Sequence, residues 1–401
     1  MLSVLEQSKV NGAKVIAINP LPEAGLLRFK DPQNVHGVLG AGVAIADSFL
    51  QIRIGGDQAL FQGLAKLLVE ADDRHPGSVI DREFIDAHCA GFDDYADHIR
   101  NVDLDAVVEA TGLAITQIVE TAQALMASNR TVICWAMGLT QHTHAVATIQ
   151  DAVALPLMRG MIGKPGAGVC PVRGHSTCRV IGRWASGRRC PILFWLRLTP
   201  NSHHQPTQAR PGCRRVTPGD ARRQGVRVHR DGWQLRRSHP DTDVTEAALR
   251  GCSLTVHVST KLNRSHLVTG RTGLILPSLG RTDKDVRAGK KQVVTVENSM
   301  SVVHLSRGGL QPASEHLRSE VAIVCGVAQA LFGTAHSVPW AQFADDYDRI
   351  RDSISRVVPG FEDFNARVRQ PDGFVLPHPP RDERRFETPS GRANFIVNEL
   401  D

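Results

Sequence analysis

Residues 163–176, which read GKPGAGVCPVRGHS, contain the residue types in this chain best suited to binding a ligand. Four glycines in the segment let the backbone approach a ligand closely, while Pro165 and Pro171 restrict the loop. Arg173 and His175 lie in the same loop with no acidic residue beside them. This combination favours a phosphate, a pterin or a carboxylate as the ligand. The alternative is a glycine-rich connector whose arginine faces solvent.

Three further loops are expected between a strand and a helix: Asn19-Pro20, Gly55-Gly56-Asp57 and residues 137–142. The first amide groups of a helix lack intrahelical partners, and the helix dipole is positive there, so such loops favour phosphate. Glycine and aspartate are also common at ordinary α/β turns. A purely structural role for Gly55-Gly56 is therefore the alternative.

The hydrophobic pattern predicts an α/β fold. A helix is expected to end at Gly12, a strand to cover residues 13–18, and a second apolar run to cover residues 43–54. Strands that alternate with helices imply parallel βαβ layers. The next helix has one buried face, formed by Leu60, Leu64, Leu67 and Leu68. The remaining expected elements are helices at 104–110, 115–127, 144–159, 242–250, 319–332 and 340–357, and strands at 131–135, 254–258, 274–277 and 293–296.

The block from residue 177 to residue 240 differs in composition from the rest of the chain. It contains 14 Arg, no Lys and only two acidic residues, Asp220 and Asp231, while the remainder carries 33 basic and 39 acidic residues. Shifted reading of GC-rich codons produces such a block, so we expect an out-of-frame, disordered insert. A nucleic-acid-binding segment is the alternative, but nucleic-acid binders usually mix Lys with Arg, and we expect no nucleic-acid partner.

Size and composition set the remaining expectations. A chain of 401 residues, 42% of them hydrophobic, predicts two or three globular domains. Of the eight cysteines, the five outside the block lie in or beside apolar runs and are expected to be buried, reduced thiols: Cys89, Cys134, Cys170, Cys252 and Cys325. No metal site is expected in this chain. The absence of a leader and of a long apolar span predicts a cytoplasmic protein without a membrane partner.

Seven segments resemble consecutive motifs of the molybdopterin oxidoreductases of the dimethyl sulfoxide reductase type. The similarity is greatest to the branch that resembles the formate dehydrogenase alpha subunit. The resemblance implies two Rossmann-like lobes that hold bis(molybdopterin guanine dinucleotide) with molybdenum. It also implies a small anionic substrate such as formate, with an unknown redox partner. The segments are residues 18–29, 45–60, 135–146, 162–176, 259–270, 274–285 and 294–308.

The resemblance assigns a role to individual residues. Arg173 matches the arginine that faces the substrate carboxylate, and the fixed fork of a guanidinium suits that task. A contact to the pterin phosphate is the alternative role for Arg173. In the first lobe, the positions matched to the cofactor are Asn19, Pro20, Asp47, Gly55, Gly56, Asp57, Met137, Gly138, Thr140, Gln141, His142, Gly174 and His175. In the second lobe they are Thr260, Lys261, Asn263, Arg264, Glu297 and Asn298.

The resemblance also implies the domain organisation. We expect a cofactor-binding domain at 1–176, the insert at 177–240, a second cofactor-binding half at 241–335, and a helix and linker at 336–401. We expect the region that supplies the molybdenum ligand and any 4Fe-4S cluster, and the C-terminal cap domain, to lie outside this chain. The expected product is a fragment with little or no activity. A non-catalytic nucleotide-binding or scaffold protein is the alternative.

Overall fold

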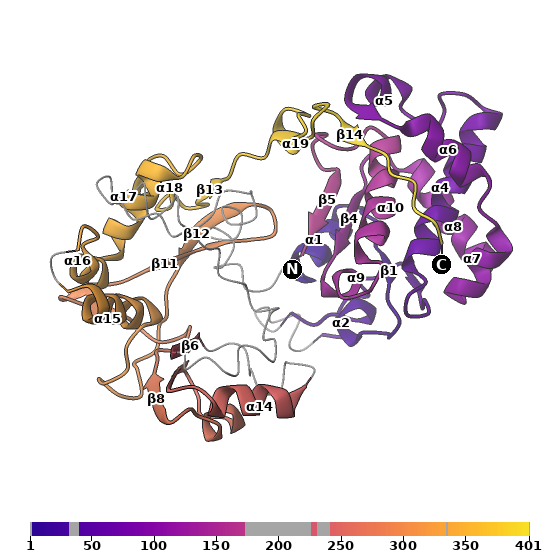
Figure 1. The fold of residues 1–401 in the computed structure, drawn as a ribbon. Coiled ribbons are helices and arrows are strands. Elements are labelled where there is room, and N and C mark those ends of the chain that lie inside the picture. Colours follow the sequence, from indigo (N-terminus) through magenta and orange to yellow (C-terminus); the bar gives the residue numbers. More distant parts are fainter. Residues whose placement is uncertain (1, 32–39, 173–225, 231–240, 334–335, 401) are drawn as a thin grey trace. The chain divides into compact units, whose positions relative to one another are not determined.

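The computed structural model divides the chain into two compact units (Figure 1). The first unit comprises Met1–Gly174 together with Pro377–Asp401, and the second comprises His175–Leu376. The expected boundary at residue 335 differs from this division, because residues 336–376 belong to the second unit and the tail to the first. The structure describes residues 2–31, 40–172, 241–333 and 336–400, and the backbone of residues 226–230.

The described part of the first unit consists of helices and short strands in mixed order. None of the described helices of the chain combines the length and apolar character needed to span a bilayer. The helices are α1 (Leu2–Val10), α2 (Ala24–Leu27), α4 (Asp57–Arg74), α5 (Arg82–His88), α6 (Phe92–Arg100), α7 (Leu104–Thr111), α8 (Ile115–Ala127), α9 (Met137–Thr140), α10 (Ala145–Met158) and α19 (Pro379–Asp382). The strands are β1 (Ile16–Ile18), β2 (Ser48–Leu50), β3 (Cys89–Ala90), β4 (Val132–Trp135), β5 (Gly168–Pro171) and β14 (Ala393–Asn394).

The loops that the sequence predicts to bind a ligand follow strands of two parallel pairs. Strand β1 pairs with β2, with Ile18 opposite Leu50. Strand β4 pairs with β5, with Cys134 opposite Cys170. The parallel pairing agrees with the alternation of strands and helices in the sequence, while a Rossmann-like arrangement remains a prediction.

Helix α4 forms the centre of the core of the first unit. Its residues Leu60, Leu64 and Leu68 are buried on the predicted face, while Leu67 is half-buried. Gly63 lies so close to α7 that a Cβ at this position would come within 2.9 Å of Val107 Cγ1. This close packing holds α4, and with it the loop that precedes the helix.

The C-terminal tail packs against the first unit (Figure 1). Strand β14 pairs in parallel with β3, and the Phe395 amide donates a hydrogen bond to the Ala90 carbonyl at 2.9 Å. The Phe395 ring lies 5.1 Å from that of Phe92 and 5.3 Å from that of Tyr95. The tail therefore differs from the expected linker. The linker was predicted from the proline and charged residues of the tail, and such local composition does not indicate that a segment pairs with a strand far away in the sequence.

The second unit contains a parallel sheet and an antiparallel sheet. In the parallel sheet, β7 lies between β6 and β8, and in the antiparallel sheet β12 lies between β11 and β13. The described elements are β6 (Val226–Arg230), α14 (Thr242–Arg250), β7 (Leu254–Ser259), η3 (Arg264–Leu267), β8 (Thr272–Pro277), β9 (Val286–Arg287), β10 (Lys290–Lys291), β11 (Val294–Glu297), β12 (Val302–Ser306), α15 (Glu320–Phe332), α16 (Trp340–Asp345), α17 (Tyr347–Val357), α18 (Phe364–Arg367) and β13 (Phe374–Val375).

Strand β6 corrects the prediction that residues 177–240 are disordered throughout. Val226–Arg230 pairs in parallel with β7, so that Val228 lies opposite Val256. Valines at alternate positions favour an extended backbone, and the edge of β7 offers N–H and C=O groups to a neighbouring strand. The rest of the block lies outside the described residues. The frame shift therefore remains a hypothesis.

The single helix expected at residues 340–357 is two helices in the structure. The chain turns at Asp346, whose φ of −146° is extended rather than helical. The Asp346 carboxylate accepts a hydrogen bond from the Asp348 amide at 3.0 Å and thereby caps the start of α17. Hydrophobic periodicity continues across this turn, which explains why the sequence suggests one helix.

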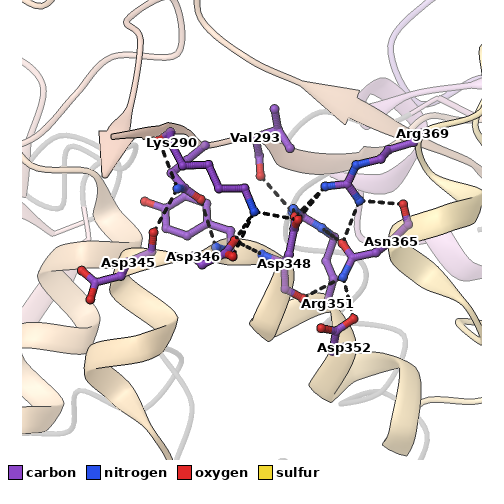
Figure 2. Close-up of polar contacts among 11 residues, drawn as sticks. Lys290, Val293, Asp345, Asp346, Asp348, Arg351, Asp352, Asn365 and Arg369 are labelled. Carbon is purple, nitrogen blue, oxygen red and sulfur yellow. Dashed lines mark hydrogen bonds and ion pairs between the residues drawn. The ribbon is translucent and has the colours of Figure 1, made fainter. Parts of the chain in front are cut away.

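An ion-pair cluster in the second unit is centred on Asp348 (Figure 2). Lys290 Nζ lies 2.9 Å from Asp348 Oδ2, Arg369 Nη2 lies 2.7 Å from the same oxygen, and the buried Arg351 also donates to this carboxylate. Burial raises the pKa of Asp348, but the hydrogen bonds from Arg369, Lys290 and Arg351 outweigh burial and hold that pKa well below its ordinary value. The cluster links β10 to α17 and to the chain after α18.

Replacing Asp348 with asparagine is expected to lower the free energy of unfolding at pH 7 by about 2 kcal/mol, because charge-assisted hydrogen bonds are lost. The folded-state pKa of Asp348 lies below its ordinary value of 3.8. The stability that Asp348 contributes to the fold is therefore fully present above pH 3.8 and declines as the pH falls below that value. Urea unfolding at pH 7 and pH 3 measures this difference. The exposed Asp372→Asn variant is the control, and an equal cost at both pH values would contradict the prediction.

Candidate functional site

The loop after β1 begins the candidate site. The Asn19 amide donates to the Leu50 carbonyl at 3.1 Å, which continues the pairing of β1 with β2 by one residue. The Asn19 side chain donates to the Leu21 carbonyl at 2.9 Å, and Gln51 donates to the Pro20 carbonyl at 3.2 Å. These bonds hold Asn19 and Pro20 at the carboxyl edge of the strand pair, where the sequence predicts them.

The loop after β2 leads into the N-terminus of α4. Gly55 has a φ of +92°, a conformation that other residues rarely adopt. A Cβ on Gly56 would lie 2.8 Å from the Ala110 carbonyl oxygen, so only glycine fits against this backbone. The two glycines thus bring the first amide groups of α4 to the edge, and the first residue of the helix is Asp57. Those amides have no partner within the helix and suit a phosphate group.

The loop after β4 contains the short helix α9 and is open to solvent. Met137 is 62% exposed, and a Cβ on Gly138 would meet no atom within 4 Å. Thr140 and Gln141 are also exposed. Both turn back on α9, since the Thr140 hydroxyl and the Gln141 amide donate to the Met137 carbonyl at 3.4 and 3.2 Å. The loop therefore presents an accessible surface rather than part of the core.

Asp57 is the titratable residue at the N-terminus of α4. Burial raises the pKa of Asp57, and the charge of His142 in the loop after α9 opposes this shift. The oxygens of the Asp57 carboxyl group can accept hydrogen bonds from the donor groups of a ligand.

The structure places Asp47 at the opposite edge of the strand pair. This residue precedes β2, and its carboxylate accepts hydrogen bonds from Lys9 Nζ and the Val15 amide, each at 2.7 Å. The hydrogen bond from Lys9, followed by that from Val15, lowers the pKa of Asp47. Asp47 therefore holds α1 and β1 together and does not reach the loops that follow the strands.

Arg173, Gly174 and His175 lie outside the described residues, but the segment that leads to them is described. In residues 163–172, three glycines have positive φ angles between 75° and 115°. Strand β5 ends at Pro171, and the Val172 amide donates to the Trp135 carbonyl at 2.7 Å. Because β5 runs parallel to β4, the chain leaves β5 at the edge where α9 begins.

The predicted residues of the second unit have different roles in the structure. Thr260, Lys261 and Arg264 are exposed in the segment after β7, where a ligand could contact them. The Asn263 side chain accepts a hydrogen bond from the Ser265 amide at 2.8 Å and caps η3. These four residues lie together in one segment of the chain.

Glu297 and Asn298 lie instead where an antiparallel hairpin turns. Glu297 is completely buried at the end of β11. The Asn298 side chain accepts hydrogen bonds from the Met300 amide at 2.9 Å and the Val302 amide at 3.1 Å, which close the turn toward β12. The structure thus gives Asn298 a local role in the turn and does not expose Glu297 to a ligand.

The exposure of apolar side chains in the loops after β1 and β2 is a feature that sequence reasoning missed. Ile54 is 78% exposed, and Leu21 is also exposed. Hydrophobicity alone does not indicate exposure. Met137, which the resemblance assigns to the cofactor, is 62% exposed. In the described residues, no group of three or more His, Cys, Asp or Glu side chains is arranged to hold a metal ion.

Comparisons with known proteins show relatives along almost the whole chain. An uncharacterized oxidoreductase of Mycobacterium tuberculosis is 59% identical over 419 residues, which cover 100% of this chain and 52% of the relative. Protein YdeP of Escherichia coli is 42% identical over 99% of this chain and 53% of that protein. Formate dehydrogenase H of Escherichia coli is 27% identical over 42% of this chain and 20% of its own length. No protein-family model matches the chain.

The chain spans about half the length of the first two of these relatives. Among solved structures, acetylene hydratase from Pelobacter acetylenicus is similar with a TM-score of 0.59 and 14% identity, over 98% of this chain and 52% of that protein. This likeness shows a shared fold. Through its oxidoreductase relatives and this fold, the chain is related to the molybdopterin oxidoreductase superfamily.

Proposed function

We propose that this chain forms the cofactor-binding part of a molybdenum-dependent oxidoreductase of the formate dehydrogenase kind. The cofactor proposed is bis(molybdopterin guanine dinucleotide), and the substrate is a small anion such as formate. The observation that carries the proposal is the N-terminus of α4, which follows β2 directly through Gly55, with its φ of +92°, and the tightly packed Gly56. Formate dehydrogenase H among the relatives supports the substrate class.

The residues of the first unit fit an anionic dinucleotide with a planar ring system. The N-terminus of the 18-residue helix α4 offers backbone amides to a phosphate, and Gly55 and Gly56 let the ligand approach the backbone. Asp57 accepts hydrogen bonds from the N–H groups of a guanine base or from ribose hydroxyls. Ile54 and Met137 offer exposed apolar surface to the flat rings.

Bound molybdenum would supply the two-electron chemistry, and the protein supplies binding, orientation and charge. We assign Arg173 to the substrate. Its guanidinium carries five N–H donors in a rigid fork, which pairs with both oxygens of a carboxylate. Arg173 follows β5 by two residues, and β5 ends at the edge that bears α9. Thr260, Lys261 and Arg264 are proposed to contact the second dinucleotide, since they are exposed after a parallel strand.

Replacing Asp57 with alanine is expected to reduce the guanine nucleotide retained by the purified chain about tenfold, because a hydrogen bond to a charged group contributes about 1.5–3 kcal/mol. Acid hydrolysis followed by chromatography measures guanosine monophosphate per chain. The exposed Asp94→Ala variant is the matched control. Equal nucleotide content in both variants would refute the assignment of Asp57. Nucleotide retained without molybdenum would favour a non-catalytic nucleotide-binding protein.

A further inference from the structure

Two cysteines lie directly opposite one another on the neighbouring parallel strands β4 and β5. Cys134 pairs with Cys170 in the register of these strands, so the two side chains share one face of the pair. The thiols are hydrogen-bonded to one another, and neither is part of a disulfide. Cys134 is exposed and Cys170 is buried. The exposure of Cys134 departs from the expectation that all five described cysteines are buried.

The strand spacing allows a covalent bond between them. Neighbouring strands lie about 4.7–4.9 Å apart, which falls within the range of about 4.4–6.8 Å between the Cα atoms of disulfide-bonded cysteines. The remaining described cysteines, Cys89, Cys252 and Cys325, are buried and have no register partner that is a cysteine. In the described part of the chain, the geometry singles out Cys134 and Cys170.

The hydrogen bond between the thiols also favours the reactive form of one of them. It lowers the pKa of Cys170 and raises the pKa of Cys134. A thiolate is the reactive form of cysteine, so this shift increases the nucleophilic share of Cys170. Cys170 is 7% exposed, so the oxidant must be as small as hydrogen peroxide. Cys89 is a contrasting case, because burial raises its pKa to about 11.

We propose that Cys134 and Cys170 form a reversible redox pair that closes to a disulfide when a peroxide oxidises Cys170. The Cys170 thiolate attacks one peroxide oxygen, the O–O bond breaks, and hydroxide leaves to give a sulfenic acid. The Cys134 sulfur then attacks the Cys170 sulfur, the S–O bond breaks, and water leaves with the thiol proton. Two thiols and one peroxide thus yield one disulfide and two waters. A thiol reductant reopens the bond by attacking the exposed sulfur of Cys134.

The disulfide would tie β4 to β5 shortly before residues 137–142 and 173–175. Those residues are the ones proposed to contact the cofactor and the substrate. The redox pair itself depends only on the strand register and the thiols. The proposed cofactor site and the redox pair can therefore fail independently.

Peptide mapping of the full chain after treatment with one equivalent of hydrogen peroxide tests the proposal. Trypsin cleaves after Arg130, Arg159 and Arg173, so the cysteines fall in separate peptides, 131–159 and 160–173. The expected result is a peptide pair joined by a disulfide, with the loss of two thiols, and full reversal by dithiothreitol. Loss of thiols without this joined pair, or Cys134 joined to another cysteine, would overturn the proposal.

Two variants and a pH series complete the test. Ser substitution of Cys178, Cys190 and Cys213 together is expected to leave the joined pair intact. Cys134→Ser is expected to trap Cys170 as a sulfenic acid that dimedone labels. If Cys134→Ser does not fold, the rate of disulfide formation in the unaltered chain decides. The midpoint of the pH dependence of this rate is expected to lie below the ordinary thiol value of about 8.5, whereas a midpoint at or above that value would contradict the proposal.

Discussion

Replacing Gly56 with alanine is expected to remove at least about nine-tenths of the molybdenum retained by the chain and to lower the free energy of unfolding by about 1–3 kcal/mol. The added Cβ would lie 2.8 Å from the Ala110 carbonyl oxygen and 3.0 Å from Thr111 Cα. Both atoms belong to backbone that cannot rotate away. The N-terminus of α4 must therefore move from α7, which displaces the amides proposed to bind phosphate. Elemental analysis and urea unfolding measure the two effects.

Gly326 provides the matched control for Gly56. It is exposed on helix α15 of the second unit, and a Cβ there would meet no atom within 4 Å. Gly326→Ala is expected to keep at least the stability of the unaltered chain, and a large loss of stability would show that α15 is packed differently. If Gly56→Ala retained as much molybdenum as Gly326→Ala, the N-terminus of α4 would not be a cofactor contact.

Replacing Gln62 with leucine is expected to lower the free energy of unfolding at pH 7 by about 3 kcal/mol, because a buried acidic group loses one of its donors. Asp151 is 0% exposed and accepts a hydrogen bond from Gln62 Nε2 at 2.9 Å. The same Gln62 nitrogen donates to the Asn398 carbonyl of the tail at 2.7 Å. Leucine fills the space but offers neither hydrogen bond. Thermal or urea unfolding at constant pH measures the loss.

The cost of Gln62→Leu is expected to increase with pH. Burial raises the pKa of Asp151, and the hydrogen bond from Gln62 partly opposes that shift. A raised folded-state pKa means that stability is lost as the pH rises from the ordinary value of 3.8 through the folded-state value. The leucine variant has the higher folded-state pKa and loses more stability over this interval.

A double-mutant cycle with Asp151→Asn isolates the interaction between Gln62 and Asp151. In the asparagine background, Gln62→Leu is expected to cost less and to show no dependence on pH between 4 and 8. The surface substitution Asp94→Asn is the control for the loss of a charge. If Gln62→Leu lowered the free energy of unfolding by the same amount in the Asp151→Asn background, the effect of Gln62 would come from its hydrogen bond to the Asn398 carbonyl rather than from Asp151.

Local sequence patterns predicted α1, α4, α7, α8 and α10 of the first unit, but not α5 or α6. Helix α8 covers Ile115–Ala127, as the periodicity of its apolar residues indicates, and α4 begins at Asp57 after the expected pair of glycines. These features depend on neighbouring residues, so the sequence contains the necessary information. The sequence also predicted that Asn19 and His142 lie in loops, because each loop follows a recognisable strand.

Features that depend on distant residues were not predictable in the same way. Within the apolar run at 43–54, β2 covers only Ser48–Leu50, and Asp47 lies immediately before it. Pairing of β14 with β3 joins segments far apart in the sequence. The contact between Cys134 and Cys170 depends on the register of β4 and β5, which no local pattern specifies. These are properties of tertiary pairing rather than of composition.

Native mass spectrometry of the chain, purified from cells that synthesise the molybdenum cofactor, tests the central claim most directly. The account predicts a folded species whose mass exceeds that of the polypeptide by molybdopterin guanine dinucleotide, and this additional mass should disappear in Gly56→Ala. A compactly folded chain that carries only the polypeptide mass under these conditions would contradict the claim that the loops after β2 and β4 bind this cofactor.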